Sequence, residues 1–307
     1  MLEGNYFPGH LALAVLAFLL DGACGLSLPA AFALIFGRKG HAAFCASGSR
    51  SLLFLSLCAG ISGIVYYPLS CFMVLAPYGN MGPPSFLQSL FSPGGMPWFS
   101  AWLVWLAGLA LLLAAFYQCG RLKIGAMADS FRMAQIRLPF YLALGGSLCF
   151  FSSFFLINWP FGGMPPELST QRVLLAVGRN AFRHWFFAFA AGGAIALAFA
   201  PYCLSRINCD KIEKMNAARY CAMWAACGAI PACFTNWGLI LGLLLRNGVL
   251  PQIQAGMHIQ LLGLFCLTFA IACWLFCFWK KRAGLIAWLG LFFLFLRALA
   301  PLLRSLG

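Results

Sequence analysis

Two good metal ligands stand side by side in the stretch QAGMHIQLLG, where Met257 and His258 open a long apolar run. Of the four histidines in the chain, His10, His184 and His258 each begin an apolar segment that we expect to enter a membrane from the same side. His41 instead lies in a basic connection and is interpreted as a loop residue. Imidazoles also suit the headgroup region of a bilayer, so interfacial anchoring is the simpler interpretation of the other three.

Haem iron in a helical bundle is held by an imidazole with a second imidazole or a thioether, from facing helices at matched depth. His184 and Met257 are expected at corresponding ends of helices that run the same way, which makes them the preferred pair. His258 stays the alternative to Met257, because adjacent helical residues point about 100° apart and only one can face the iron. Haem propionates need cationic partners near the polar boundary. The arginines expected at that level are Arg179, Arg183, Arg246 and, in the outer third of the last span, Arg297.

Asp21 is the one acid expected well inside an apolar segment. It follows His10 by eleven residues, which on a helix returns to nearly the same face roughly 16 Å deeper. An ionisable residue at such a depth is a functional candidate by default, here as a proton relay or as the partner of a buried cation. A hydrogen bond within the bundle, to a neighbour such as Ser27, is the structural alternative.

The elements that position these residues follow from composition. The chain has 307 residues, is 63% hydrophobic and only 8% charged, whereas soluble domains carry about 25% charged residues. Its apolar stretches are long enough to cross a hydrocarbon layer of roughly 30 Å, and the first lacks a cleavage site behind a basic leader, so we expect it to be retained. The sequence predicts an all-α, polytopic membrane protein with eight transmembrane helices. The expected spans are 9–36, 51–77, 98–118, 139–160, 183–205, 220–245, 257–279 and 284–303.

The net charge of +14 is distributed unevenly among the connections. Most cations fall in the odd-numbered connections, which the positive-inside rule assigns to the cytoplasm, so both termini are expected outside. The basic balance therefore indicates topology, and nucleic acid is not an expected partner. These cations are Arg38, Lys39 and Arg50; Arg121, Lys123, Arg132 and Arg137; Arg206, Lys211, Lys214 and Arg219; and Lys280, Lys281 and Arg282.

The two halves of the chain resemble each other weakly. RSLLFLSLCAG (Arg50 to Gly60) and RYCAMWAACGA (Arg219 to Ala229) both place Arg eight residues before Cys, with Gly just after. This pattern predicts two four-helix bundles within one membrane domain, residues 1–160 and 161–307, the second carrying the main haem site. The fourteen cysteines form no CxxC pair, and most are interpreted as small apolar residues. The uncharged connection from Ala76 to Trp98 fits contact with lipid or a partner subunit.

The order of these segments resembles subunit I of the cytochrome bd quinol oxidases. FPGHLALAVLAFLL (Phe7 to Leu20) is similar to that family's first helix, whose high-spin haem histidine corresponds to His10. FRHWFFAFAAGGAIAL (Phe182 to Leu197) resembles the fifth helix, with His184 in the place of the low-spin haem b ligand. AGMHIQLLGL (Ala255 to Leu264) resembles the seventh, with Met257 in the place of the other axial ligand. Two further segments, Cys58 to Pro68 and Phe140 to Gly162, resemble the second and fourth helices.

The chain departs from the family where oxygen is reduced. The family has glutamates in its third span and in a late helix, but the third span here, Ser100 to Gly120, holds no acid, and none follows Glu213. The family's long quinol-binding loop is reduced to about Arg246 to Gln254, and a late Gly-Arg-Gln-Pro-Trp-like signature is missing. Oxygen reduction is therefore not expected, whereas the outer haem b site is retained.

The resemblance implies a haem b subunit of the bacterial inner (cytoplasmic) membrane that oxidises a membrane quinol. Electrons are expected to pass outward to a periplasmic cytochrome or a similar membrane partner, and Glu167 or Asp21 to accept quinol protons. A membrane transporter is the first alternative, based on the two-bundle pattern and on Pro29, Pro68, Pro201 and Pro231 within spans. A cofactor-free membrane anchor of a redox complex is the second.

Overall fold

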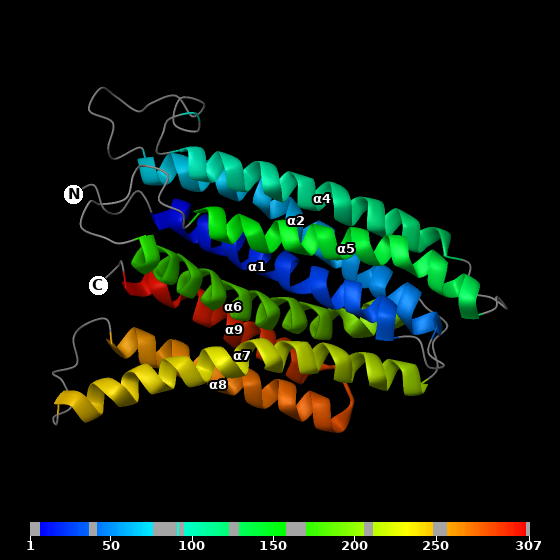
Figure 1. Ribbon diagram of the computed structural model, residues 1–307. Helices are drawn as coiled ribbons and strands as arrows, with labels where there is room; N and C mark the ends of the chain where they lie inside the picture. The colour runs from blue at the N-terminus through cyan, green and yellow to red at the C-terminus, as the bar shows by residue number, and fades with distance from the viewer. Residues whose placement is uncertain are drawn as a thin grey trace. The chain divides into compact units, whose positions relative to one another are not determined.

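The computed structural model describes residues 7–36, 42–75, 91, 95–122, 129–157, 170–205, 211–247 and 257–304. Regular structure in these residues is entirely α-helical, in eight helices (Figure 1), which confirms the all-α class for this part of the chain. The helices are α1 (Phe7–Phe36), α2 (Ala42–Leu75), α4 (Met96–Arg121), α5 (Asp129–Ile157), α6 (Thr170–Ser205), α7 (Lys211–Asn247), α8 (Met257–Lys280) and α9 (Leu285–Arg304).

Each expected span overlaps one of these helices, but four helices begin well before the apolar segment that predicted them. Helix α2 begins at Ala42, α5 at Asp129, α6 at Thr170 and α7 at Lys211, about two to four turns earlier than expected. Backbone hydrogen bonding continues a helix through polar residues, whereas hydropathy marks only the part that suits hydrocarbon. The residues 170–180, expected in a connection, are therefore the first turns of α6.

Five of the helices are long and apolar enough to cross a membrane: His10–Ile35, Gly48–Phe72, Met96–Arg121, Gln135–Ile157 and Leu261–Lys280. His184–Phe199 and Leu285–Ala300 are shorter apolar helices. The chain is thus a multi-pass helical membrane protein by length and composition, and the crossing of all eight segments stays a prediction.

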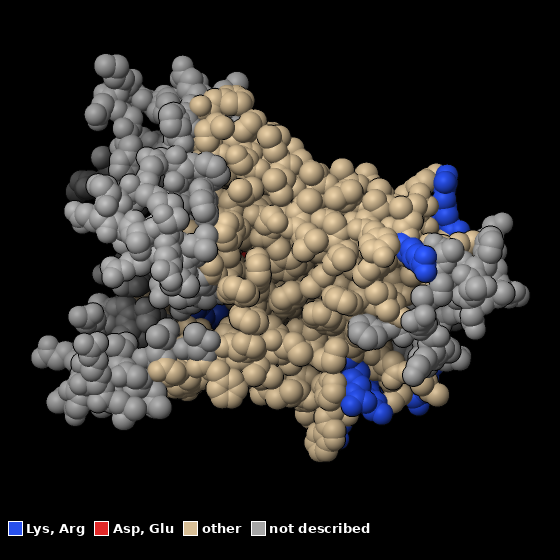
Figure 2. Space-filling model, in the orientation of Figure 1, with Lys and Arg blue, Asp and Glu red and all other residues tan. Residues whose placement is uncertain are grey.

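The outward faces of the helices support this assignment. Helix α4 buries Ala101, Trp105 and Leu112 on one face, yet Leu103 and Leu113 on the opposite face are 48% and 58% exposed. A helix that is apolar on both faces needs an apolar solvent, because contiguous exposed apolar surface is rare on soluble monomers. Figure 2 shows a described surface that is largely uncharged. These helices are therefore suited to contact with lipid.

The described helices group into two compact units. The first unit comprises residues 1–26 and 186–307, and the second comprises residues 27–185, so that α1 and α6 contribute to both. The expected division near residue 160 stays a prediction.

In the second unit, Trp105 of α4 joins three helices. Its indole N–H donates a hydrogen bond to the Gly60 carbonyl of α2 at 2.9 Å, and its ring stacks on Phe150 of α5 with centroids 3.8 Å apart. The Tyr67 and Ser153 hydroxyls, from α2 and α5, lie 2.6 Å apart. These contacts hold α2, α4 and α5 together.

In the first unit, small residues let helix backbones touch. A Cβ atom at Gly25 of α1 would overlap the Ala188 carbonyl of α6, and one at Gly192 would overlap the Gly25 backbone. On another face of α6, a Cβ at Gly193 would overlap the Ala225 backbone of α7. Glycine is therefore required where α6 meets its neighbours.

Cations gather at one end of each unit. In the second unit, Arg50 at the start of α2 lies 4.9 Å from the ring centroid of Phe116 near the end of α4. In the first, Arg219 near the start of α7 lies 4.5 Å from the Phe278 ring near the end of α8. The Arg-to-Cys pattern seen in both halves of the sequence thus recurs as the same cation–aromatic contact between corresponding helices.

Candidate functional site

His184 lies on α6 in the second unit, at the start of the apolar helix segment His184–Phe199. Its imidazole stacks on Phe154 of α5, with ring centroids 5.4 Å apart and planes inclined by only 5°. Phe154 is buried, whereas His184 is exposed. Next to it, the Trp185 indole donates a hydrogen bond to the Phe151 carbonyl at 3.3 Å. Two aromatic contacts with α5 therefore set the orientation of α6 around His184.

This arrangement fits the chemistry of a haem ligand. Both nitrogens of an imidazole lie in the plane of its ring, whereas stacking on Phe154 uses a face of the ring. A ligating histidine uses one nitrogen for the metal and normally donates a hydrogen bond from the other. In the structure, the ring of His184 is stacked on Phe154 and is exposed.

Met257 and His258 are the first two residues of α8 in the first unit. Their backbone begins the helix at the residue that the sequence predicted, but their side chains lie outside the described part of the structure. Arg246 belongs to the last turn of α7 and Arg183 to α6, and their side chains are likewise outside it. The pairing of His184 with Met257, or with His258, stays a prediction.

Arg297 is half-buried between α9 and α8. A Cβ atom at Gly263 of α8 would lie 2.8 Å from the Arg297 Cδ atom and 3.3 Å from its Nε atom. Gly263 therefore creates the space through which the arginine side chain passes. An arginine held in such a slot between apolar helices fits a specific anionic partner.

His10 and Asp21 both lie on α1 in the first unit. His10 is exposed at the start of the candidate span His10–Ile35, as expected for a residue near a membrane boundary. Asp21 is buried, with 8% of its surface exposed, among Gly22, Ala23 and Cys24. A hydrogen bond within the bundle, to a neighbour such as Ser27, stays the structural alternative for Asp21.

The other expected site residue, Glu167, lies outside the described residues, as does Arg206 among the basic connections. Within the described ranges, no three His, Cys, Asp or Glu side chains come together as they would to hold a metal ion. A haem needs only two axial ligands from the protein, so this finding bears on clusters and zinc-type sites rather than on the haem expected here.

Two residues of the site were not identified from the sequence. Phe154 is one of 31 phenylalanines, and its place under His184 depends on the rotation of α5 against α6. Gly263 could have been noticed, because a lone Gly in an apolar helix indicates close approach by a neighbour, but its partner Arg297 could not be identified.

Comparison with models of protein families, with curated proteins and with solved structures finds no match for this chain.

Proposed function

We propose that the chain is a haem b-containing membrane subunit that oxidises a membrane quinol and passes the electrons to a periplasmic or membrane cytochrome partner, without reducing oxygen. The resemblance to subunit I of the cytochrome bd quinol oxidases supports this assignment. The observation that carries it is the stacking of His184 on Phe154, which holds an exposed imidazole at the end of an apolar helix.

The residues of the chain have separate tasks in this proposal. Haem b, when bound, supplies one-electron transfer. His184 and Met257 would hold it, with His258 as the alternative to Met257 and His10 as the candidate for a second haem. The arginines expected near the boundary would balance its propionates; they are Arg183, Arg246 and Arg297.

A quinol that becomes a quinone releases two electrons and two protons. The electrons go to the cytochrome partner one at a time, and the protons need acceptors near the quinol. Glu167 and Asp21 are the carboxyl groups proposed for this task. Proton release is expected on the outer side of the bacterial inner membrane, with the cation-rich helix ends facing the cytoplasm.

The experiment is a reduced-minus-oxidised spectrum of the protein purified in detergent, with the haem-to-protein ratio measured as the pyridine haemochrome. His184→Ala and Met257→Leu are expected to lose the low-spin haem signal while retaining the folded protein, judged by gel filtration and circular dichroism. His41→Ala is the matched control, because it removes an imidazole from a connection. A haem-free wild-type protein, or a spectrum unchanged by His184→Ala, would end the proposal.

One observation favours a second function. Asp21 is a buried carboxyl inside the candidate span His10–Ile35. Intramembrane carboxyls of this kind often lie on ion or proton pathways, which supports a membrane transporter. Cation or proton uptake by proteoliposomes, abolished by Asp21→Asn, would favour the transporter. A protein with neither haem nor uptake would instead be a cofactor-free anchor subunit.

A further inference from the structure

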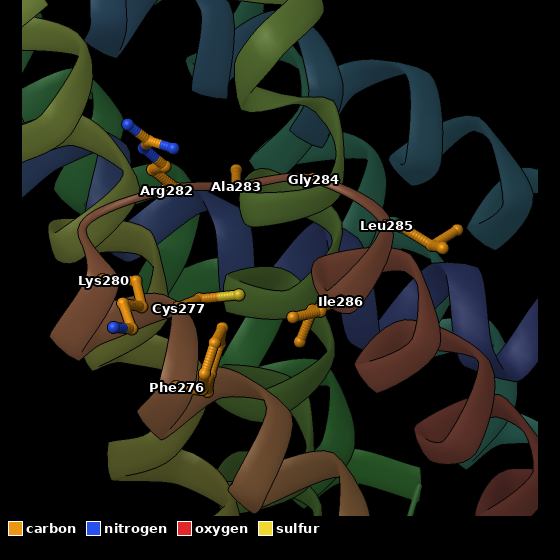
Figure 3. A pocket seen from close by; sticks show the side chains of 8 residues that line it. All are labelled: Phe276, Cys277, Lys280, Arg282, Ala283, Gly284, Leu285 and Ile286. Carbon is orange, nitrogen blue, oxygen red and sulfur yellow. The ribbon is translucent and has the colours of Figure 1, made fainter.

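A cavity of about 740 Å³ lies under the connection between α8 and α9 in the first unit (Figure 3). This connection joins the cation-rich end of α8 to the start of α9, far along both helices from Met257 and Arg297. The cavity is lined by Phe276, Cys277, Lys280, Arg282, Ala283, Gly284, Leu285 and Ile286.

The cavity has an apolar interior and a cationic rim. In Figure 3, Cys277 of α8 and Ile286 of α9 point toward one another below the connection, and Phe276 lies beside them. Lys280 and Arg282 extend from the end of α8 and from the first part of the connection. In Figure 3 these two side chains point away from one another, so the two positive charges flank the space between Cys277 and Ile286.

The backbone at this rim is held in a defined conformation. Lys281 has a φ of 52°, and it is the one non-glycine residue with positive φ in the described part of the chain. The Arg282 N–H donates to the Cys277 carbonyl at 3.3 Å, which closes the last turn of α8. Glycine usually occupies this left-handed position because it has no Cβ. A lysine there keeps three consecutive cations, Lys280 to Arg282, at the rim despite the cost in backbone strain.

Aromatic rings hold one of these charges in place. The Lys280 Nζ atom lies 5.0 Å from the Trp279 ring centroid and 6.0 Å from that of Phe276. Cation–π contact limits the motion of the long side chain while its N–H groups can still donate. The ammonium group is therefore positioned beside the cavity instead of moving freely in solvent.

The surrounding charge is strongly positive. The start of α7 is next to the end of α8, as the contact of Arg219 with Phe278 shows, and it adds Lys211 and Lys214. Glu213, in the first turn of α7, is the one acid of that helix. Lys280 is also the last residue of the candidate span Leu261–Lys280, which places the rim at the level of lipid headgroups.

We propose that this cavity binds a phosphate-bearing anion, with the phosphate at Lys280 and Arg282 and the apolar part of the ligand against Phe276 and Ile286. Phosphate is the chemistry that clustered Lys and Arg recognise on this side of a membrane. Anionic phospholipid and a soluble phosphate compound share that chemistry. The apolar interior favours the lipid, since free phosphate would use only the rim. The inference is independent of haem binding.

The test is calorimetric titration of the full-length protein in detergent with dihexanoyl phosphatidylglycerol and, separately, with inorganic phosphate. Lys280→Gln combined with Arg282→Gln is expected to weaken phosphatidylglycerol binding roughly 30-fold, from about a factor of five for each cation at the surface. Lys211→Gln combined with Lys214→Gln is the matched control, because it removes the same charge from the same end of the unit outside the cavity. Binding to the control is expected to change by less than about twofold.

A third variant, Ile286→Trp, fills the cavity and keeps both cations, with gel filtration and circular dichroism to check the fold. Loss of phosphatidylglycerol binding in this variant with phosphate binding retained would support lipid as the source. Equal affinity for both probes, insensitive to Ile286→Trp, would support a soluble phosphate compound. Absence of saturable binding of either probe to the wild-type protein would overturn the proposal, as would an equal loss in the Lys211 and Lys214 control.

Discussion

A methyl group added at Gly25 would overlap the carbonyl of Ala188 and lie 2.9 Å from the backbone nitrogen of Gly192. Both neighbours are backbone atoms of α6, which cannot rotate away as a side chain does. Overpacking of a close-packed core costs about 1–3 kcal/mol, and the rigid neighbours place Gly25→Ala at the upper end of that range. The greater helix propensity of Ala offsets up to about 1 kcal/mol. We expect a net loss of about 2 kcal/mol, or roughly 30-fold in the unfolding equilibrium.

The assay is unfolding by sodium dodecyl sulfate in mixed micelles, followed by tryptophan fluorescence. Gly178→Ala is the matched control, because a Cβ at Gly178 meets no atom within 4 Å; this variant is expected to be at least as stable as the wild type. The stability of Gly22→Ala should lie between those of Gly25→Ala and Gly178→Ala, since the added Cβ meets only the flexible end of Ile195. If Gly25→Ala proved as stable as Gly178→Ala, the backbone contact between α1 and α6 would be refuted.

Three further predictions concern the core, the buried acid and the arginine slot. Trp105→Phe is expected to lower the unfolding free energy by about 1–2 kcal/mol, since it loses a hydrogen bond to α2. Trp102→Phe should lower the unfolding free energy by less, because the buried Trp102 indole N–H has no hydrogen-bond partner among the described residues. Asp21→Asn is expected to leave the protein as stable or to stabilise it by up to about 3 kcal/mol in the same titration, because it removes the cost of burying an ionisable carboxyl; a large loss would reveal a cation paired with the acid. In haem-loaded protein, Gly263→Ala is expected to displace Arg297 and lower the midpoint potential by about 40 mV, equivalent to about 1 kcal/mol for one electron. A redox titration unchanged from wild type would show that the arginine acts elsewhere.

The starts and ends of helices were predictable where contact with lipid requires apolar residues. The start of α8 at Met257 and the end of α6 at Ser205 agree with the expected spans, because apolar runs have sharp limits there. The beginnings of α2, α5, α6 and α7 were not predicted, since polar turns beyond the hydrocarbon carry no hydropathy signal. At Asp129 the helix starts ten residues before Pro139, which was expected to begin the span.

The candidate site was less predictable, because it depends on how helices rotate against one another. Spacing alone placed His184 at the start of an apolar helix segment, where the structure has it. Its stacking on Phe154, and the passage of Arg297 past Gly263, arise from contacts between helices that no local pattern encodes. The cavity at the α8–α9 connection was missed for another reason: its three cations were interpreted only as a signal of topology.

The meeting of Gly25 with Gly192 also constrains how the chain is assembled during synthesis. The two glycines are far apart in the sequence, so at about 5–20 residues per second α1 waits roughly ten seconds or more before the matching part of α6 leaves the ribosome. Adjacent helices such as α4 and α5 can pair almost at once. Helix α1 is therefore made well before its final neighbours, and a product that terminates before α6 would leave the buried face of α1, Asp21 included, exposed to quality-control proteases.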